Sequence, residues 1–167
     1  MFRGFPTRFP NLMKRLGFVF IGLVVLIMLV PSVSRAQRRT NGNEPEGAPA
    51  FNDFKGVKIG THADEARKKL GNPRDKSADQ DFYMFGENQA VQVYYDKSGA
   101  VSAISIDFMS GASGIPSCKD VLGAEAEAKA DGSVYKLIRY PKAGYWVSYS
   151  RTAGNSPTVT VTMQKID

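Results

Sequence analysis

The feature that most constrains this chain is a pattern that occurs twice: a short helix signal followed by three strand-like runs. In each pass a glycine ends the helix signal, and the first apolar residue of the first strand-like run lies eleven residues later. These steps run from Gly71 to Phe82 and from Gly123 to Val134. The same order at the same spacing predicts two similar units, over residues 51–112 and 113–167.

The two helix signals differ in length. In the first, apolar residues fall on one helical stripe between His62 and Leu70, and Thr61 precedes Asp64 at the spacing of a capping box. In the second, Ser117 precedes an acidic residue at the same spacing. The basic run 67–69 is typical of a solvated helix end near the negative pole of the helix dipole. The sequence therefore predicts a helix over 62–70 and a shorter one after Ser117.

Six runs rich in β-branched and aromatic residues follow these helices, three after each. Turn-forming residues bound each run, which is typical of strands joined by hairpins. The alanine- and glutamate-rich segment 124–130 is predicted to be a loop. The strand-like runs are 81–89, 90–99, 100–109, 133–141, 144–151 and 157–165.

Side chains alternate between the two faces of a strand, so the runs also predict which residues share a face. One parity is apolar, as in Val91 and Val93. The other carries polar residues and two large aromatics, Tyr94 and Trp146. This alternation predicts an α+β fold: two αβββ units side by side in an antiparallel sheet, with helices packed on one face and the other face open. The candidate partner-binding residues on the open face are Gln92, Tyr94, Ser105, Trp146, Ser148, Thr160 and Thr162. For Tyr94 and Trp146, two readings stay open: partner anchors, or aromatics covered by a neighbouring strand or merely tolerated at the surface.

The amino-terminal region predicts where the protein goes. Basic residues precede an apolar run from Leu16 to Val30, Pro31 follows, and small residues at Ser34 and Ala36 suit a cleavage site. We expect residues 1–36 to be a signal peptide cleaved near Ala36, which sends the protein to the periplasm or outside the cell. The alternative is an uncleaved membrane anchor over residues 16–30, a run shorter than the roughly 20 residues that usually span a bilayer. Residues 37–50 are rich in Pro, Gly and Glu without an apolar period, and are expected to form a disordered linker.

The net positive charge of the chain comes largely from the predicted signal peptide. The whole chain has 22 basic and 16 acidic residues, a net charge of +6. Without residues 1–36 there remain 17 basic and 16 acidic residues, a net charge of +1. Nucleic-acid binders normally carry a clustered positive footprint, so we expect no nucleic-acid partner.

Residues that could carry chemistry are scarce. The chain has one histidine, His62, and one cysteine, Cys118. Metal sites usually need several His, Cys or carboxylate ligands, and the segment 111–114 lacks the lysine of a phosphate-binding loop. A lone cysteine is more typical of a small buried hydrophobe than of a nucleophile. We therefore expect no catalytic residue, no cofactor and no metal. A Cys118 nucleophile with His62 as its base stays as a remote alternative.

These residues resemble a known repeat. Gly60-Thr61, Asp64-Glu65 and Leu70-Gly71-x-Pro73, followed by three strands, look like the unit shared by the outer-membrane assembly lipoproteins of the SmpA/OmlA (BamE-like) type and the β-lactamase inhibitory proteins. The tandem arrangement is more similar to the inhibitory proteins. Gln37 stands where the lipoproteins carry a lipid-bearing cysteine, and one cysteine excludes the disulfides of the inhibitory proteins. The resemblance implies a tandem fold and binding through the sheet face, and identifies no contact residue.

The expected function is a secreted or periplasmic, non-catalytic binding module whose partner is a protein in the envelope or outside the cell. The alternative is a membrane-anchored structural or scaffolding component of the cell envelope, which requires that the amino-terminal segment stay uncleaved. Contact with the membrane is expected only in that case.

Overall fold

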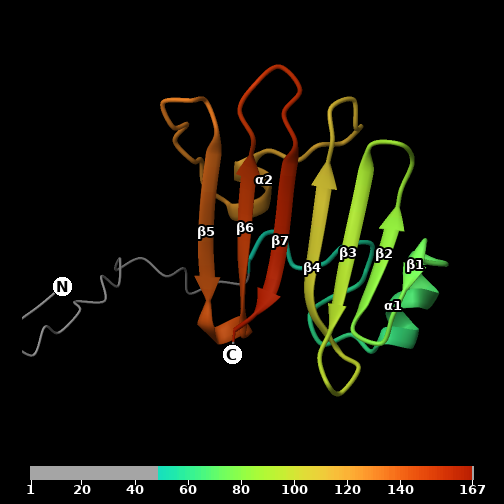
Figure 1. Cartoon of the computed structure of the whole chain (residues 1–167). Coiled ribbons are helices and arrows are strands. Elements are labelled where there is room, and N and C mark those ends of the chain that lie inside the picture. The colour runs from blue at the N-terminus through green and yellow to red at the C-terminus, as the bar shows by residue number, and fades with distance from the viewer. Residues whose placement is uncertain (1–48, 167) are drawn as a thin grey trace, which may run out of the picture. The chain divides into compact units, whose positions relative to one another are not determined.

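The computed structural model describes residues 49–166. The predicted signal peptide and nearly all of the predicted linker lie outside these residues. The described part is an α+β fold built on one seven-stranded sheet, in which all neighbouring strands run antiparallel (Figure 1). The predicted α+β class and the antiparallel sheet are therefore confirmed.

The elements follow the predicted order closely. The helices are α1 (Ala63–Leu70), α2 (Cys118–Leu122) and a short 3-10 helix, η1 (Pro141–Ala143). The strands are β1 (Asp75–Lys76), β2 (Gln80–Met84), β3 (Gln89–Tyr95), β4 (Val101–Phe108), β5 (Val134–Tyr140), β6 (Tyr145–Arg151) and β7 (Val159–Lys165). Among the strands only β1 was not predicted, because two exposed residues carry no strand signal. Segment 124–130 is a loop with one isolated bridge, as predicted.

The strand order in the sheet is β1-β2-β3-β4-β7-β6-β5. The first four strands follow one another, and the last three are added in reverse order, so that β4 and β7 meet in the middle (Figure 1). At this junction Ile106 lies opposite Val161, and Ile104 lies opposite Met163. All four of these side chains are fully buried, which places the core across the β4–β7 junction.

The two helices begin differently. The Thr61 capping box is not formed: the hydroxyl of Thr61 accepts a hydrogen bond from the Lys58 amide, and His62 is the N-cap without a side-chain bond. Instead the first helical amide, Ala63 N, donates to the Gly99 carbonyl at 2.9 Å. The β3–β4 turn therefore satisfies a helix donor that a side chain would otherwise cap.

At α2 the predicted cap is present. Ser117 accepts from the Asp120 amide at 3.1 Å, and the Asp120 carboxylate accepts from the Ser117 amide at 2.9 Å. Gly123 then ends the helix with φ 68° and ψ 4°, a left-handed conformation that glycine adopts without steric cost. This five-residue helix is thus fixed at both ends by its local sequence.

One core cluster joins the sheet to both helices. It includes Ala66 of α1 and Val121 of α2 together with Val93, Val147 and other strand residues of the same parity. Burial in β3 and β7 follows the predicted alternation, and in β6 it departs from it at Ser148, which is buried between the buried Val147 and Tyr149. In β4 the alternation is interrupted, because a register shift opposite Tyr94 and Tyr95 turns both Val101 and Ile104 inward.

Candidate functional site

The face opposite this core brings the predicted binding residues together. Residues opposite each other in an antiparallel pair share a face, so the register traces three rows across β2, β3, β4, β7, β6 and β5. We call this set of eighteen residues the polar face. The rows are Met84–Ala90–Asp107–Thr160–Ser150–Tyr135, Phe82–Gln92–Ser105–Thr162–Ser148–Leu137 and Gln80–Tyr94–Ala103–Gln164–Trp146–Arg139. All seven predicted residues lie in these rows.

Most of the polar face is accessible. Its residues are partly or fully exposed, except Ala103 and Ser148, each 8 % exposed. Ser148 is thus on the predicted face, but it is buried between larger neighbours. Its strand neighbours in the row are Leu137 and Thr162. A partner would contact the larger side chains of Leu137 and Thr162 rather than Ser148 itself.

The two aromatics of this face lie in one row. Tyr94 on β3 and Trp146 on β6 are separated by Ala103 and Gln164. Three strand spacings of about 4.8 Å place them about 14 Å apart. Both are half-buried, so part of each residue remains open to solvent. Ala103, directly opposite Tyr94 on β4, has a short side chain that projects less from the sheet than its neighbours do.

Hydroxyl and amide groups hold the centre of this face in place. Ser105 Oγ and Thr162 Oγ1 lie 3.1 Å apart across the β4–β7 junction. Thr160 Oγ1 donates to Asp107 Oδ1 at 2.6 Å, and the Tyr94 hydroxyl donates to the Gln92 side-chain carbonyl. These polar groups are paired along the sheet and remain partly open to solvent. Such groups can exchange bonds with a partner without leaving a buried polar atom unsatisfied.

The sequence did not predict the contribution of β5 to this face. Tyr135, Leu137 and Arg139 belong to the polar face, and the first two are 55 % and 37 % exposed. Both parities of this strand contain large apolar residues and a cation, so period two alone could not orient it. The alternation of apolar and polar residues is weak in β5 because it is an edge strand. Fewer neighbours bury its side chains, so the residue types on its two faces differ less.

A buried carboxylate lies on the core side of β2. Asp81 has 0 % exposure and accepts two hydrogen bonds from Arg67, from Nε to Oδ2 at 2.8 Å and from Nη2 to Oδ1 at 3.1 Å. The hydroxyls of Tyr95 and Tyr83 donate to the same Oδ2 at 2.7 and 3.3 Å. The Arg67 guanidinium also lies 5.3 Å from the Tyr95 ring centroid. We call these four residues the Asp81 cluster.

The prediction that Arg67 belongs to a solvated helix end is therefore wrong. Its side chain is only 20 % exposed, because it reaches from α1 to the buried Asp81. Burial alone would raise the pKa of Asp81, but the hydrogen bonds from Arg67 and Tyr95 and the Arg67 charge lower it below its usual value. Burial, with the neighbouring carboxylate, raises the pKa of Tyr83 to about 12 and also raises that of Tyr95. The cluster holds a fixed negative charge that is fully hydrogen-bonded, an arrangement typical of a structural ion pair.

The two residues considered for catalysis lie in different settings. The His62 side chain is 63 % exposed, and its nearest charged group is Asp64, 3.9 Å away. Cys118 is a buried free thiol, 6 % exposed, and burial raises its pKa. A raised pKa disfavours the reactive thiolate. Burial of Cys118 confirms its reading as a small core residue. Within residues 49–166 no group of three or more His, Cys, Asp or Glu is placed to hold a metal ion.

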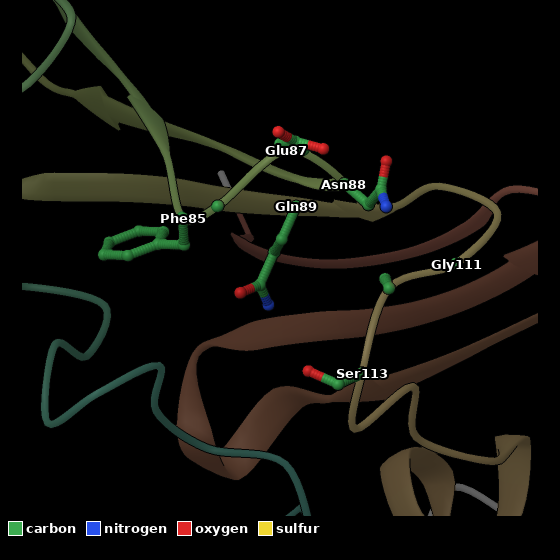
Figure 2. A pocket seen from close by; sticks show the side chains of 8 residues that line it. Phe85, Glu87, Asn88, Gln89, Gly111 and Ser113 are labelled. Carbon is green, nitrogen blue, oxygen red and sulfur yellow. The ribbon is translucent and has the colours of Figure 1, made fainter.

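A small pocket of about 150 Å³ lies between the β2–β3 turn and the segment after β4 (Figure 2). Its lining includes Phe85, Asn88, Gln89 and Ser113. The Gln89 side chain points into this space, as Figure 2 shows.

No protein-family model, curated protein or solved structure matches this chain. Among the described helices, none combines the length and apolar character needed to cross a membrane.

Proposed function

We propose that this protein is a secreted or periplasmic, non-catalytic binding module that binds a protein partner through the polar face. The observation that carries this proposal is the continuity of that face across six strands, with half-buried Tyr94 and Trp146 and exposed Tyr135. Tyrosine, tryptophan and arginine are the residues that most often dominate the energy of protein interfaces. Arg139 lies directly beside Trp146 in the same row.

The architecture that we propose behind this face is a tandem of two αβββ units, 51–112 and 113–167, with their helices covering the opposite side of the sheet. Three features support it. Each helix precedes its strands in the chain, the two sets of strands meet at β4 and β7, and residues of both helices share one core cluster. The same arrangement is implied by the resemblance to the β-lactamase inhibitory proteins.

The binding proposal predicts a selective loss of partner. We expect Trp146→Ala and Tyr94→Ala each to weaken retention of the partner about 30-fold or more, the effect of losing a hot spot worth about 2 kcal/mol. The measurement is quantitative mass spectrometry of proteins that immobilised wild type and variants retain from an envelope extract. Because Trp146 is the only tryptophan, its fluorescence also reports binding directly.

Lys119→Ala provides the matched control, since Lys119 is exposed on α2 rather than on the polar face. It should retain the same proteins as wild type. If both aromatic variants retain every protein as strongly as Lys119→Ala does, the polar face is not the binding surface.

The proposed location makes a separate prediction. Expression of the complete chain in a secreting host should yield a mature protein that begins near Gln37. Amino-terminal sequencing checks this. An intact Met1 end in the membrane fraction would contradict cleavage and would favour the anchored, scaffolding role instead.

A further inference from the structure

The sheet ends in an edge strand at β5. This strand pairs with β6 along its whole length, from Val134 opposite Arg151 to Tyr140 opposite Tyr145 (Figure 1). On its other side, within residues 49–166, it carries only an isolated bridge between Ala128 and Val134. The backbone from Tyr135 onward therefore forms a sheet edge that can accept another strand.

This edge lacks two of the features that protect edge strands from pairing with another chain. It contains no proline, and its pairing with β6 shows no register shift. Of the three exposed large hydrophobic residues in the described chain, two lie here: Tyr135 and Leu137, with Ile115 elsewhere. Lys136 is a charge of the kind that protects edges, but its ammonium donates to the Glu125 carbonyl at 2.6 Å.

We propose that the occupant of this edge is a second copy of this chain, which pairs β5 with β5 in antiparallel register about Leu137. The two sheets then continue into one another across a two-fold axis. The interface is isologous, because the same strand serves on both sides.

The sequence of β5 is complementary to itself in this register. Leu137 meets Leu137 of the other copy, Tyr135 meets Arg139, and Lys136 meets Ile138. Directly opposite side chains interact most strongly in a sheet, and a guanidinium beside a tyrosine ring is attracted to it. Pairing about Lys136 would instead place two ammonium groups opposite each other, which is destabilising. Charge repulsion therefore favours antiparallel pairing centred on Leu137 over pairing centred on Lys136.

The dimer goes beyond the proposed binding function and does not depend on it. Antiparallel pairing keeps equivalent faces on the same side, so the polar faces of the two copies would lie next to each other. A protein that dimerises could bind a partner at each polar face. A protein that stays monomeric could still bind one.

The first test is the mass in solution, measured by sedimentation velocity on protein purified after expression of the complete chain. We expect twice the monomer mass for wild type and the monomer mass for Leu137→Lys, which puts two cations opposite each other. Ile115→Lys is the matched control, since Ile115 is 41 % exposed and lies outside β5, and it should stay dimeric. A wild type that stays monomeric up to about 1 mM, the weak end of measured affinities, overturns the proposal.

The second test fixes the register through disulfide formation in a Cys118→Ala background. Leu137→Cys should cross-link two copies, because directly opposite residues lie about 5 Å apart, within disulfide range. Arg139→Cys alone should not, since the two new thiols would be offset by four residues, about 13 Å. Combining Arg139→Cys with Tyr135→Cys should restore the cross-link.

Non-reducing gels read out these variants, with Lys97→Cys in the exposed β3–β4 turn as the control for random oxidation. Cross-linking of Arg139→Cys alone, or of Lys97→Cys as readily as Leu137→Cys, overturns the proposed pairing. A wild type that is monomeric and still binds its partner would refute this inference and leave the binding function standing.

Discussion

Arg67→Ala should lower the free energy of unfolding by about 3–5 kcal/mol, the cost of removing one partner from a buried ion pair. Asp81 has no solvent contact, and Arg67 supplies two of its four side-chain hydrogen bonds and its neutralising charge. The two tyrosine hydroxyls that remain cannot balance a buried negative charge. Urea unfolding of wild type and variant measures the difference.

Lys68→Ala is the matched control, because Lys68 is the next residue on α1 and is exposed. Its replacement should change stability by no more than about 0.5 kcal/mol. Equal effects for the two variants would show that the Asp81 cluster contributes nothing particular to the fold.

The loss of stability in Arg67→Ala should depend on pH. In wild type the pKa of Asp81 lies below its usual value, so the ionised group contributes stability above the unfolded pKa of about 3.9 and loses it as the pH falls through the folded-state pKa. Without Arg67, burial should raise the pKa of Asp81 above the usual value, and protonation then stabilises the variant. The stability difference between the two proteins should therefore shrink as the pH falls through the region around 4. A difference that stays constant from pH 7 to pH 3 would contradict a charge effect.

Ile106→Ala should lower the free energy of unfolding by about 2–5 kcal/mol. Ile106 is fully buried on β4 and lies opposite Val161 at the junction of the two sets of strands. Both neighbouring strands are fixed by backbone pairing, so they cannot move in to fill the space. Thermal or urea unfolding measures the loss.

The adjacent residue provides the control. Ser105 lies on the polar face, and Ser105→Ala removes only its partly exposed contact with Thr162. We expect a loss of about 1 kcal/mol or less. If Ser105→Ala is the more damaging change, the assignment of core and polar face is inverted.

Local sequence determined much of this protein. The capping box at Ser117 and the left-handed Gly123 fix α2 with groups only a few residues apart, so the sequence alone predicted that helix. Six strands were predicted because each run is rich in β-branched and aromatic residues and is bounded by turn-forming residues. The alternation of apolar and polar residues predicted that Tyr94 and Trp146 share a face, although they are distant in the chain.

Other features depend on partners that are distant in sequence, and only the tertiary structure decided them. Arg67 reads as a surface residue among lysines, yet it pairs with Asp81 fourteen residues away. The start of α1 is satisfied by the Gly99 carbonyl rather than by a local cap. The orientation of β5, and with it the exposure of Tyr135 and Leu137, follows from its position at the edge of the sheet. The alternation of residues along one strand specifies which of them share a face. Packing across the whole sheet decides which strands become neighbours and which strand lies at the edge.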